Sequence, residues 1–516
     1  MPHFLLLLLL ACLGEAASLM RRGLKWGKCN DIFFNSSLPY SCTSHKVPLD
    51  WTEPQNGVIE LQLIKVSAPQ QPSKGSIQVN FGGPGLEMRD VLLSNAKRLL
   101  RSTGGIYDLV AFDPRGTGNT IPFNCSNNPL QLTELLSHLR LSNANNQSAG
   151  QNWAFGDAIS SQCWHHGQGV GDLIGTAFSA RDLMSVVDAL EEDGKLRYWG
   201  FSYGTTLGAT VSAMFPDRID KVVLDGNQNI HEYYYGYGEI EPLTDSDTAF
   251  SNMWSKCIEA GASRCSLAAT YNDSAVLERD VWNLIDELKE NPLAIKSKER
   301  SFILNHGAFT TLLLNSLRTI YSWPPLATAV DLLIKKQTDS EEFSNIFSEL
   351  LPSSKEDIVS GIFDLVRLLG IRGSDRFTRA KSRNELSATI AKQERLSRLG
   401  GPPAAALSLL LSQWKFDAKE RYEGPWEDIK TSYPLLIVGN TLDAQTPLKC
   451  AHNTSAIFDD SVVLEVQIYG HTTLAGRSKC AESTIATYFV NGTLPAKGTV
   501  CPVDLQPYEK ANRGAS

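Results

Sequence analysis

The stretch RYWGFSYGTTLGA (residues 197–209) places a serine between two glycines at the end of an apolar run. The pattern Gly200-x-Ser202-x-Gly204 is short, and alone it is a weak indication of a nucleophile. Here the run 196–201 predicts a buried strand, and the small residues after it predict a helix. A tight strand-to-helix turn forces the serine into a strained conformation with an exposed hydroxyl. The stretch therefore predicts a nucleophilic serine at the carboxyl end of a strand.

Short apolar, β-branched runs alternate with helical patterns on both sides of this turn. Between residues 179 and 190, for example, apolar side chains recur every three or four positions, as they do on one face of a helix. This alternation predicts parallel βαβ units. We therefore expect an α/β fold with a mostly parallel central sheet, whose strands lie at 59–66, 76–81, 108–113, 196–201, 221–226, 434–440 and 462–470.

The alternation stops near residue 230 and resumes near residue 434. The interval holds long helix-like stretches, such as 273–291 and 402–416, and no clear strand-turn-strand signal. The economical interpretation is a mostly helical lid inserted into one α/β domain. The expected organisation is a signal segment at 1–16, the first part of the core at 17–230, the lid at 231–430 and the second part of the core at 431–516.

A serine hydroxyl is a poor nucleophile unless a base accepts its proton. In a large class of serine enzymes built on this turn, the chain order is Ser, then Asp or Glu, then His. Asp443 directly follows the strand predicted at 434–440, and His471 directly follows the next one. His452 falls in the helix expected between them, beside a glycosylation sequon, and is interpreted as a surface residue. We predict that His471 is the base for Ser202 and that Asp443 orients it.

Acyl transfer also needs N–H donors for the negative oxygen that forms on the attacked carbonyl. The glycines of NFGGPG (80–85) follow a predicted strand and allow the backbone to turn its N–H groups inward. We predict Gly83 as the first donor, with Gly82 as the alternative. Tyr203, directly after the serine, supplies the second. The competing interpretation of this segment is a plain glycine-proline turn.

The N-terminal sequence MPHFLLLLLLACLGEAAS is typical of a secretory signal peptide, because its apolar stretch is too short to span a bilayer. We expect cleavage after Ala16; the alternative is an anchor at the membrane surface. Sequons for N-glycosylation also favour a secretory route. They occur at Asn35, Asn124, Asn146, Asn272, Asn453 and Asn491. The expected product is a secreted, extracellular glycoprotein.

Nine of the ten cysteines lie beyond the expected signal segment, and they lack the paired C-x-x-C spacing of a zinc site. An oxidising compartment favours disulfides. Pairing of sequence neighbours predicts four disulfides and leaves Cys450 over, although spacing alone does not fix the connectivity. The pairs are Cys29–Cys42, Cys125–Cys163, Cys257–Cys265 and Cys480–Cys501. His165 and His166 follow Cys163 but are more typical of a solvated segment, so no metal is expected.

The amino-acid composition limits the classes of protein to which the chain can belong. The chain has 516 residues, of which 42% are hydrophobic and 20% charged, and its formal net charge is −8. These values are typical of a globular protein long enough for a large core. No Lys/Arg run indicates nucleic-acid binding, and no segment after the N-terminal one is apolar enough to cross a membrane.

Several stretches together carry a family resemblance. They are VNFGGPG, YDLVAFDPRGTGNT, ARDLMSVVDAL, YWGFSYGTTLGATVSAMFPDRIDKVVLDG, NTLDAQTP and YGHTTLAG. In this order they resemble the secreted tripeptidyl aminopeptidase-like branch of the proline iminopeptidase family (peptidase S33) of α/β-hydrolases. The resemblance covers about 55–235 and 430–505. It implies an α/β-hydrolase fold with a helical lid and a serine peptidase or related hydrolase activity without a cofactor.

By motif, the resemblance places the triad on Ser202, Asp443 and His471, and the oxyanion hole on Gly83 and Tyr203. These are the residues that strand-end placement predicts. One departure is Asn80-Phe81, where relatives often have Asn-Pro or His-Gly. It affects the wall of the hole rather than its donors.

The lid is the part that the resemblance does not match, and the lid sets substrate choice. An exopeptidase needs a carboxylate for the substrate's ammonium group. The acidic run that begins the lid offers Glu239 and Glu241 first, followed by Asp245 and Asp247; the alternative is a solvated helix start. The tyrosines within 233–237 either line the pocket or pack the lid.

The expected function is that of an aminopeptidase releasing short N-terminal peptides or residues. The alternative is an esterase or amidase that acts on a small natural product, because one core serves many substrates. A third possibility, from another class, is a non-catalytic binding protein on a hydrolase scaffold, which the complete triad disfavours. The expected partner is a peptide or a small ester or amide substrate.

Overall fold

The computed structural model describes residues 23–30, 36–296, 301–350 and 355–509. The expected signal segment at 1–16 and the sequon at Asn35 lie outside these ranges. Across the described ranges, no helix combines the length and the apolar character that a membrane span requires.

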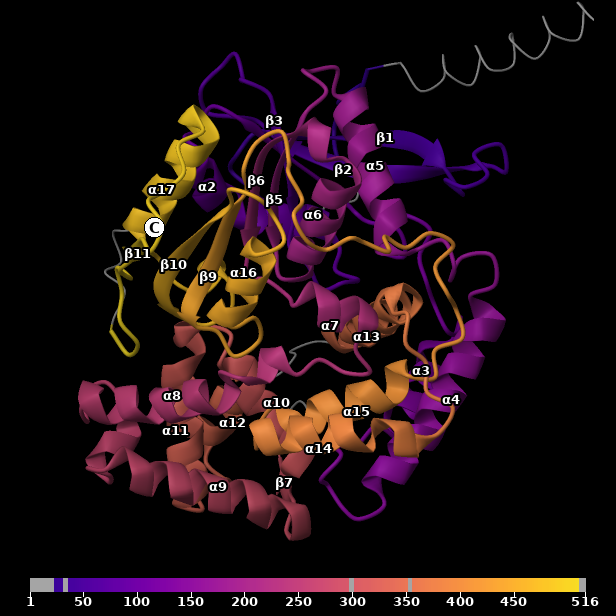
Figure 1. Ribbon diagram of the computed structural model, residues 1–516. Coiled ribbons are helices and arrows are strands. Elements are labelled where there is room, and N and C mark those ends of the chain that lie inside the picture. Colours follow the sequence, from indigo (N-terminus) through magenta and orange to yellow (C-terminus); the bar gives the residue numbers. More distant parts are fainter. Residues whose placement is uncertain (1–22, 31–35, 297–300, 351–354, 510–516) are drawn as a thin grey trace, which may run out of the picture.

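A nine-stranded sheet forms the centre of the molecule (Figure 1). Its order is β1-β2-β4-β3-β5-β6-β9-β10-β11. The pairs from β4 through β11 are parallel, whereas β1, β2 and β4 pair antiparallel at one edge. The predicted α/β fold with a mostly parallel sheet is confirmed. The strands are β1 (Tyr40–Pro48), β2 (Val58–Val66), β3 (Ser76–Asn80), β4 (Asp108–Phe112), β5 (Leu196–Phe201), β6 (Ile219–Asp225), β9 (Leu436–Leu442), β10 (Val462–Tyr469) and β11 (Val500–Cys501).

Helices cover both faces of this sheet. On one face lie α2 and α17, and on the other lie α5, α6 and α16. Tyr198 and Trp199 are neighbours on β5 and pack into the apolar clusters on opposite faces. Because both faces are covered, β5 is buried at every position. The helices are α2 (Met88–Ser102), α5 (Thr176–Ala189), α6 (Tyr203–Met214), α16 (Leu448–Ser455) and α17 (Lys479–Asn491).

A second layer of helices faces the carboxyl ends of the strands (Figure 1). Helices α8 to α12 bury their own apolar cluster, which includes Phe250, Trp254 and Trp323. Helix α4 (Ser148–His166) comes from the first half of the chain but packs against α15. The bounds 231–430 for a lid domain stay a prediction. The helices are α7 (Ile230–Tyr235), α8 (Ser246–Ala260), α9 (Ser274–Glu290), α10 (His306–Ser316), α11 (Trp323–Ile334), α12 (Glu341–Leu350), α13 (Lys355–Asp375), α14 (Ser387–Leu396) and α15 (Gly401–Leu411).

Two short strands interrupt the helical layer. β7 (Leu293–Ile295) pairs antiparallel with β8 (Phe302–Leu304). The sequence showed no strand-turn-strand signal in this mostly helical interval, so this pair was missed. Each strand has only three residues, which is too few for alternation to be recognised in the sequence.

Four disulfides join the predicted neighbours, and Cys450 is left unpaired and buried. The predicted pairing is confirmed. Disulfides of this number indicate an oxidising compartment outside the cytoplasm. Of the predicted glycosylation sites in the described ranges, Asn146, Asn272, Asn453 and Asn491 are exposed and Asn124 is half-buried.

The unpaired cysteine yields a prediction. Burial raises the pKa of the Cys450 thiol well above its usual value, so the native protein should react slowly with a thiol reagent. Denaturation without a reductant should then release one reactive thiol from residues 23–509. The measurement is thiol titration with and without guanidinium chloride, followed by mass mapping. A map that placed Cys450 in a disulfide would contradict the pairing.

Candidate active site

Ser202 lies between the last residue of β5 and the first residue of α6. Its φ is 56° and its ψ is −123°, which is a strained conformation for a residue other than glycine. Two backbone hydrogen bonds hold it. The N–H of Ser202 donates to the carbonyl of Asp225 at 3.0 Å, and the N–H of Thr205 donates to the carbonyl of Ser202 at 2.8 Å. The turn has the geometry of a nucleophile elbow.

Glycine is required on both sides of this serine. A Cβ on Gly200 would lie 2.2 Å from the carbonyl oxygen of Gly204. A Cβ on Gly204 would lie 2.5 Å from the carbonyl oxygen of Asn80 on β3. Backbone oxygens cannot move away without disrupting the sheet, so β5, α6 and β3 approach one another only because these side chains are absent.

Asp443 and His471 meet at the same edge of the sheet. Asp443 directly follows β9, and His471 lies two residues beyond β10. Because β9 and β10 are parallel neighbours, their carboxyl ends lie together. Nδ1 of His471 is 3.0 Å from Oδ2 of Asp443. The N–H of His471 also donates to the carbonyl of Arg318 at 2.8 Å, which ties the histidine loop to the helical layer.

The Asp443 carboxylate is fully buried, and donors surround it. Backbone N–H groups of Gln445, Thr446 and Thr472 donate to it at 2.8–3.1 Å, and the Thr446 hydroxyl donates at 2.7 Å. Burial by itself raises the pKa of Asp443, but the charge of His471 and these hydrogen bonds outweigh it and lower the pKa. The carboxylate is therefore ionised at neutral pH and holds the proton of His471 on Nδ1.

The other ring nitrogen, Nε2 of His471, is buried and has no hydrogen-bond partner among the described residues. Asp225, at the end of β6, links its loop to the serine turn. Its carbonyl accepts from Ser202, and its carboxylate accepts from the N–H of Thr473 at 2.9 Å and from the Thr473 hydroxyl at 2.5 Å. Burial raises the pKa of Asp225 to about 6. A buried imidazole nitrogen without a partner, at the sheet edge that also carries the half-buried Ser202, is available to act as a general base.

The glycine loop after β3 lies directly against the serine turn. A Cβ on Gly82 would lie 2.9 Å from the backbone nitrogen of Tyr203. The N–H of Gly82 donates to Oδ1 of Asn80 at 2.9 Å and is therefore occupied. The N–H groups of Gly83 and Tyr203 have no acceptor in the part of the chain that the structure describes. This difference favours Gly83 over Gly82 as a donor, although both glycines have a positive φ.

Glu239, one of the two carboxylates predicted to bind substrate, is already paired. It forms ion pairs with Arg372 and with Arg376, the latter at 3.6 Å. Both arginines belong to the C-terminal end of α13 or follow it directly. Burial lowers the pKa of each to about 10. The charge of Glu239 is thus neutralised by buried cations of the helical layer.

Glu241 is also engaged, and it is 5% exposed. Its carboxylate accepts from the amides of Asn229 and Asn453, and Nζ of Lys449 lies 3.3 Å away. The structure therefore brings neither Glu239 nor Glu241 to the Asp443–His471 pair.

Asp245, from the same acidic run, does approach that pair. It directly precedes α8, whose first residue, Ser246, donates its hydroxyl to the carbonyl of Ala444 at 3.1 Å. Burial, followed by the charge of Asp443, raises the pKa of Asp245 to about 6. Within the described ranges Asp245 forms no ion pair. The sequence showed the acidic run but not which of its members faces the strand ends.

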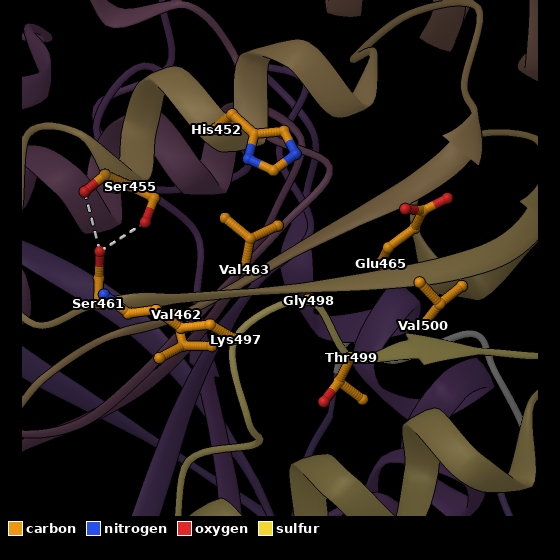
Figure 2. Close-up of a pocket in the computed structure, with 10 residues that line it drawn as sticks. All are labelled: His452, Ser455, Ser461, Val462, Val463, Glu465, Lys497, Gly498, Thr499 and Val500. Carbon is orange, nitrogen blue, oxygen red and sulfur yellow. Dashed lines mark hydrogen bonds between the residues drawn. The ribbon is translucent and has the colours of Figure 1, made fainter.

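The remaining predicted groups lie elsewhere. His452 is on α16 and lines a cavity of about 250 Å³ beside β10 and β11, with Lys497 and Glu465 as neighbours in the lining (Figure 2). Of the two histidines after Asp443, only His471 contacts it. Cys163 forms a disulfide with Cys125, so it is not a metal ligand. Across the described residues no group of three His, Cys, Asp or Glu side chains has the arrangement of a metal site.

Two known protein families match separate parts of the chain. Residues 82–251 match a family described as "alpha/beta hydrolase fold", and residues 404–501 match one described as "TAP-like protein". The first match contains the serine turn. The second contains Asp443 and His471.

Curated relatives are distant. The chain is 28% identical to a tripeptidyl aminopeptidase of Streptomyces lividans over 46% of its length and 44% of the relative's, so it matches less than half of that protein. It is 23% identical to the serine protease Hip1 of Mycobacterium tuberculosis over 92% of this chain and 90% of that one. It is 25% identical to carboxylesterase B of Mycobacterium tuberculosis over 92% and 89%.

The geometry predicts the effect of removing each group. Ser202→Ala, Asp443→Asn and His471→Ala should each leave a folded protein whose kcat is lower by about 10⁴- to 10⁶-fold, because a triad acts as a unit. His452→Ala is the matched control and should keep the wild-type rate. Turnover of an activated ester or anilide, with melting temperatures in parallel, makes the comparison. An inactive His452→Ala variant, or a Ser202→Ala variant with a tenth of wild-type turnover, would refute the assignment.

Proposed function

Because the chain is an α/β hydrolase with a TAP-like C-terminal segment, we propose that it is a secreted serine hydrolase that works through an acyl-enzyme. Ser202 is the nucleophile, His471 the base and Asp443 the orienting acid. The observation that carries this proposal is the buried Asp443–His471 pair, at 3.0 Å, whose free Nε2 lies at the sheet edge that also presents the strained Ser202 turn.

The chemical steps follow from these positions. Nε2 of His471 takes the proton of the Ser202 hydroxyl as the oxygen attacks the substrate carbonyl. The N–H groups of Gly83 and Tyr203 stabilise the oxyanion. His471 then donates its proton to the departing amine or alcohol, which leaves an ester of Ser202. Water, deprotonated by the same nitrogen, hydrolyses that ester and restores the serine.

Peptides with a free N-terminus are the proposed substrates. Support comes from the relatives named as a tripeptidyl aminopeptidase and a serine protease, and from Asp245. An ammonium group that enters a partly desolvated site needs a carboxylate partner. Within the described ranges Asp245 forms no ion pair; it contacts Thr244 and lies near Asp443, whereas Glu239 and Glu241 are engaged with cations and amides. We therefore assign the ammonium contact to Asp245 in place of those two residues.

Ester hydrolysis is the second candidate. The observation in its favour is the relative named carboxylesterase B, which matches nearly the whole chain. An esterase would use the same triad and would not need Asp245.

The experiment that tests the function is labelling with a fluorophosphonate, which phosphonylates an activated serine. The wild-type protein should be labelled on Ser202, and labelling should disappear in Ser202→Ala and His471→Ala. A folded wild-type protein without label would instead indicate a non-catalytic binding protein.

Substrate choice gives a further prediction. A peptide p-nitroanilide with a free N-terminus should be hydrolysed with a kcat/KM about 10² to 10³ times that of its N-acetylated form, because one buried charged contact is lost. Asp245→Asn should abolish this preference, while Glu239→Gln should not reduce it. A short-chain p-nitrophenyl ester should be indifferent to Asp245→Asn. Equal rates on both anilides, or a large preference for the ester, would favour the esterase.

The same assignment predicts a pH dependence. The pKa of Asp245 is raised to about 6, so its carboxylate is charged above that pH and neutral below it. The ratio of kcat/KM for the free and the acetylated anilide should therefore fall as the pH is lowered from 7 to 5. Effects of pH on the triad are common to both anilides and cancel in the ratio. A ratio that stays constant over this range would contradict the role of Asp245.

A further inference from the structure

Helix α13 of the helical layer contacts the glycine loop that holds the first proposed donor. A Cβ on Gly85 would lie 2.7 Å from Cβ of Arg367 and 3.1 Å from the carbonyl oxygen of Asp364. The Arg367 guanidinium also lies 3.1 Å from the carboxylate of Glu87 and 3.3 Å from that of Asp364. The loop 82–87 is therefore held between the serine turn on one side and α13 on the other.

The C-terminal end of the same helix is linked to the second proposed donor. Asp375, the last residue of α13, is fully buried. It accepts from the N–H of Thr176 at 2.8 Å, from the Thr176 hydroxyl at 2.5 Å and from the Tyr233 hydroxyl at 2.9 Å. Since Thr176 gives its proton to Asp375, the hydroxyl of Tyr203 is the donor in its 2.6 Å contact with Thr176.

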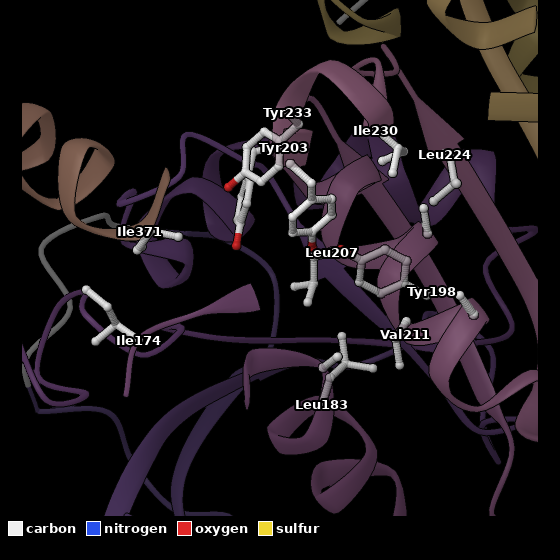
Figure 3. Close-up of a cluster of buried hydrophobic side chains, with 14 of the residues drawn as sticks. Ile174, Leu183, Tyr198, Tyr203, Leu207, Val211, Leu224, Ile230, Tyr233 and Ile371 are labelled. Carbon is white, nitrogen blue, oxygen red and sulfur yellow. The ribbon is translucent and has the colours of Figure 1, made fainter. Parts of the chain in front are cut away.

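The apolar surroundings fix this chain of hydrogen bonds in place. The rings of Tyr203 and Tyr233 are 6.0 Å apart, and Ile371 of α13 belongs to the same buried cluster (Figure 3). Thr176 is the first residue of α5, and its N–H is one of the groups at the helix N-terminus that lack a partner within the helix. The Asp375 carboxylate supplies that partner. The side chain of Tyr203 is thus anchored through Thr176 to the helical layer.

We propose that α13 positions both halves of the oxyanion hole, with Arg367 and Asp375 as its positioning residues. Arg367 and the helix surface at Gly85 set the loop of Gly83. Asp375, through Thr176, fixes the position of the Tyr203 ring and thereby the position of the first N–H of α6. The inference rests on the proposed function, since Gly83 and Tyr203 are donors only in a serine hydrolase. Its consequence is that the oxyanion hole is complete only when α13 is seated on the core.

Thr176 offers a matched pair of variants. Thr176→Val keeps the shape of the side chain but removes the hydroxyl that joins Tyr203 to Asp375, whereas Thr176→Ser keeps that hydroxyl. We expect Thr176→Val to lower kcat by about 10- to 100-fold with a KM within about threefold of wild type, because the loss falls on the transition state. Thr176→Ser should stay within about threefold. Tyr203→Phe, which cuts the same link at its other end, should resemble Thr176→Val.

Two further readouts separate positioning from simple destabilisation. Affinity for a boronic acid, whose tetrahedral adduct occupies the oxyanion hole, should fall in parallel with kcat. Because Thr176→Val and Tyr203→Phe break one link, their effects should not add in the double variant. Arg367→Met tests the other half of the hole and should lower kcat by a similar factor, while Arg367→Lys should recover part of it. Melting temperatures provide the control for folding.

The rate constant of fluorophosphonate labelling allows the test without a known substrate. A wild-type protein that is not labelled would overturn the proposed function and this inference together. A labelled wild type would leave the function standing, and the variants would then decide. A Thr176→Val variant with wild-type kcat and labelling rate, or one no slower than Thr176→Ser, would overturn the positioning role alone. Losses that follow the melting temperature, with unchanged boronate affinity, would overturn it as well.

Discussion

The geometry of the site depends on the positive φ of Ser202. The surrounding sheet stabilises this conformation. Such a conformation costs on the order of 1–3 kcal/mol and persists only where the surroundings fix it. Here β3, β5 and α6 approach so closely that Gly200 and Gly204 have no room for a side chain. The hydrogen bond from Ser202 to Asp225 adds the neighbouring strand β6. The serine is therefore placed by three strands, and its hydroxyl is presented at their carboxyl edge.

Buried carboxylates at this edge have different charges because their neighbours differ. Asp225, Asp375 and Asp443 are all fully buried, and burial alone raises the pKa of each. For Asp225 and Asp375 burial prevails, and the pKa rises to about 6. For Asp443 the charge of His471 and the surrounding donors reverse the direction. Of these three carboxylates, only that of Asp443, beside His471, has a lowered pKa and is held firmly in its ionised form.

The sequence was sufficient to predict the strands that position the site. Seven apolar, β-branched runs corresponded to β2–β6, β9 and β10, because strands buried on both faces have little freedom in composition. The antiparallel edge strand β1 was missed, since a polar sequence such as YSCTSHKVP pairs with β2 through its backbone. The placement of Asp443 and His471 after consecutive strands followed from parallel topology alone.

The sequence alone could not predict which charged side chains form ion pairs across the helical layer. Glu239 is neutralised by arginines more than 130 residues away in the chain, Arg372 and Arg376, and no local pattern marks such partners. For the same reason the sequence could not distinguish Asp245 from the other members of the acidic run. Asp245 is placed near Asp443 by the long-range hydrogen bond between the neighbouring residues Ser246 and Ala444.

The helical layer is not uniform in its attachment to the core. Helices α8 to α12 share an apolar cluster that reaches the core at Leu442 and Ala444, whereas the apolar residues of α13 belong to the cluster that contains Tyr203 and one face of the central sheet. Substitutions within the first group alter packing that is largely separate from the serine turn. Substitutions in α13 alter the packing that holds it. If Gly83 and Tyr203 are the oxyanion donors, we expect α13 to tolerate fewer substitutions than α8 to α12, since backbone N–H donors can be adjusted only through the side chains that support them.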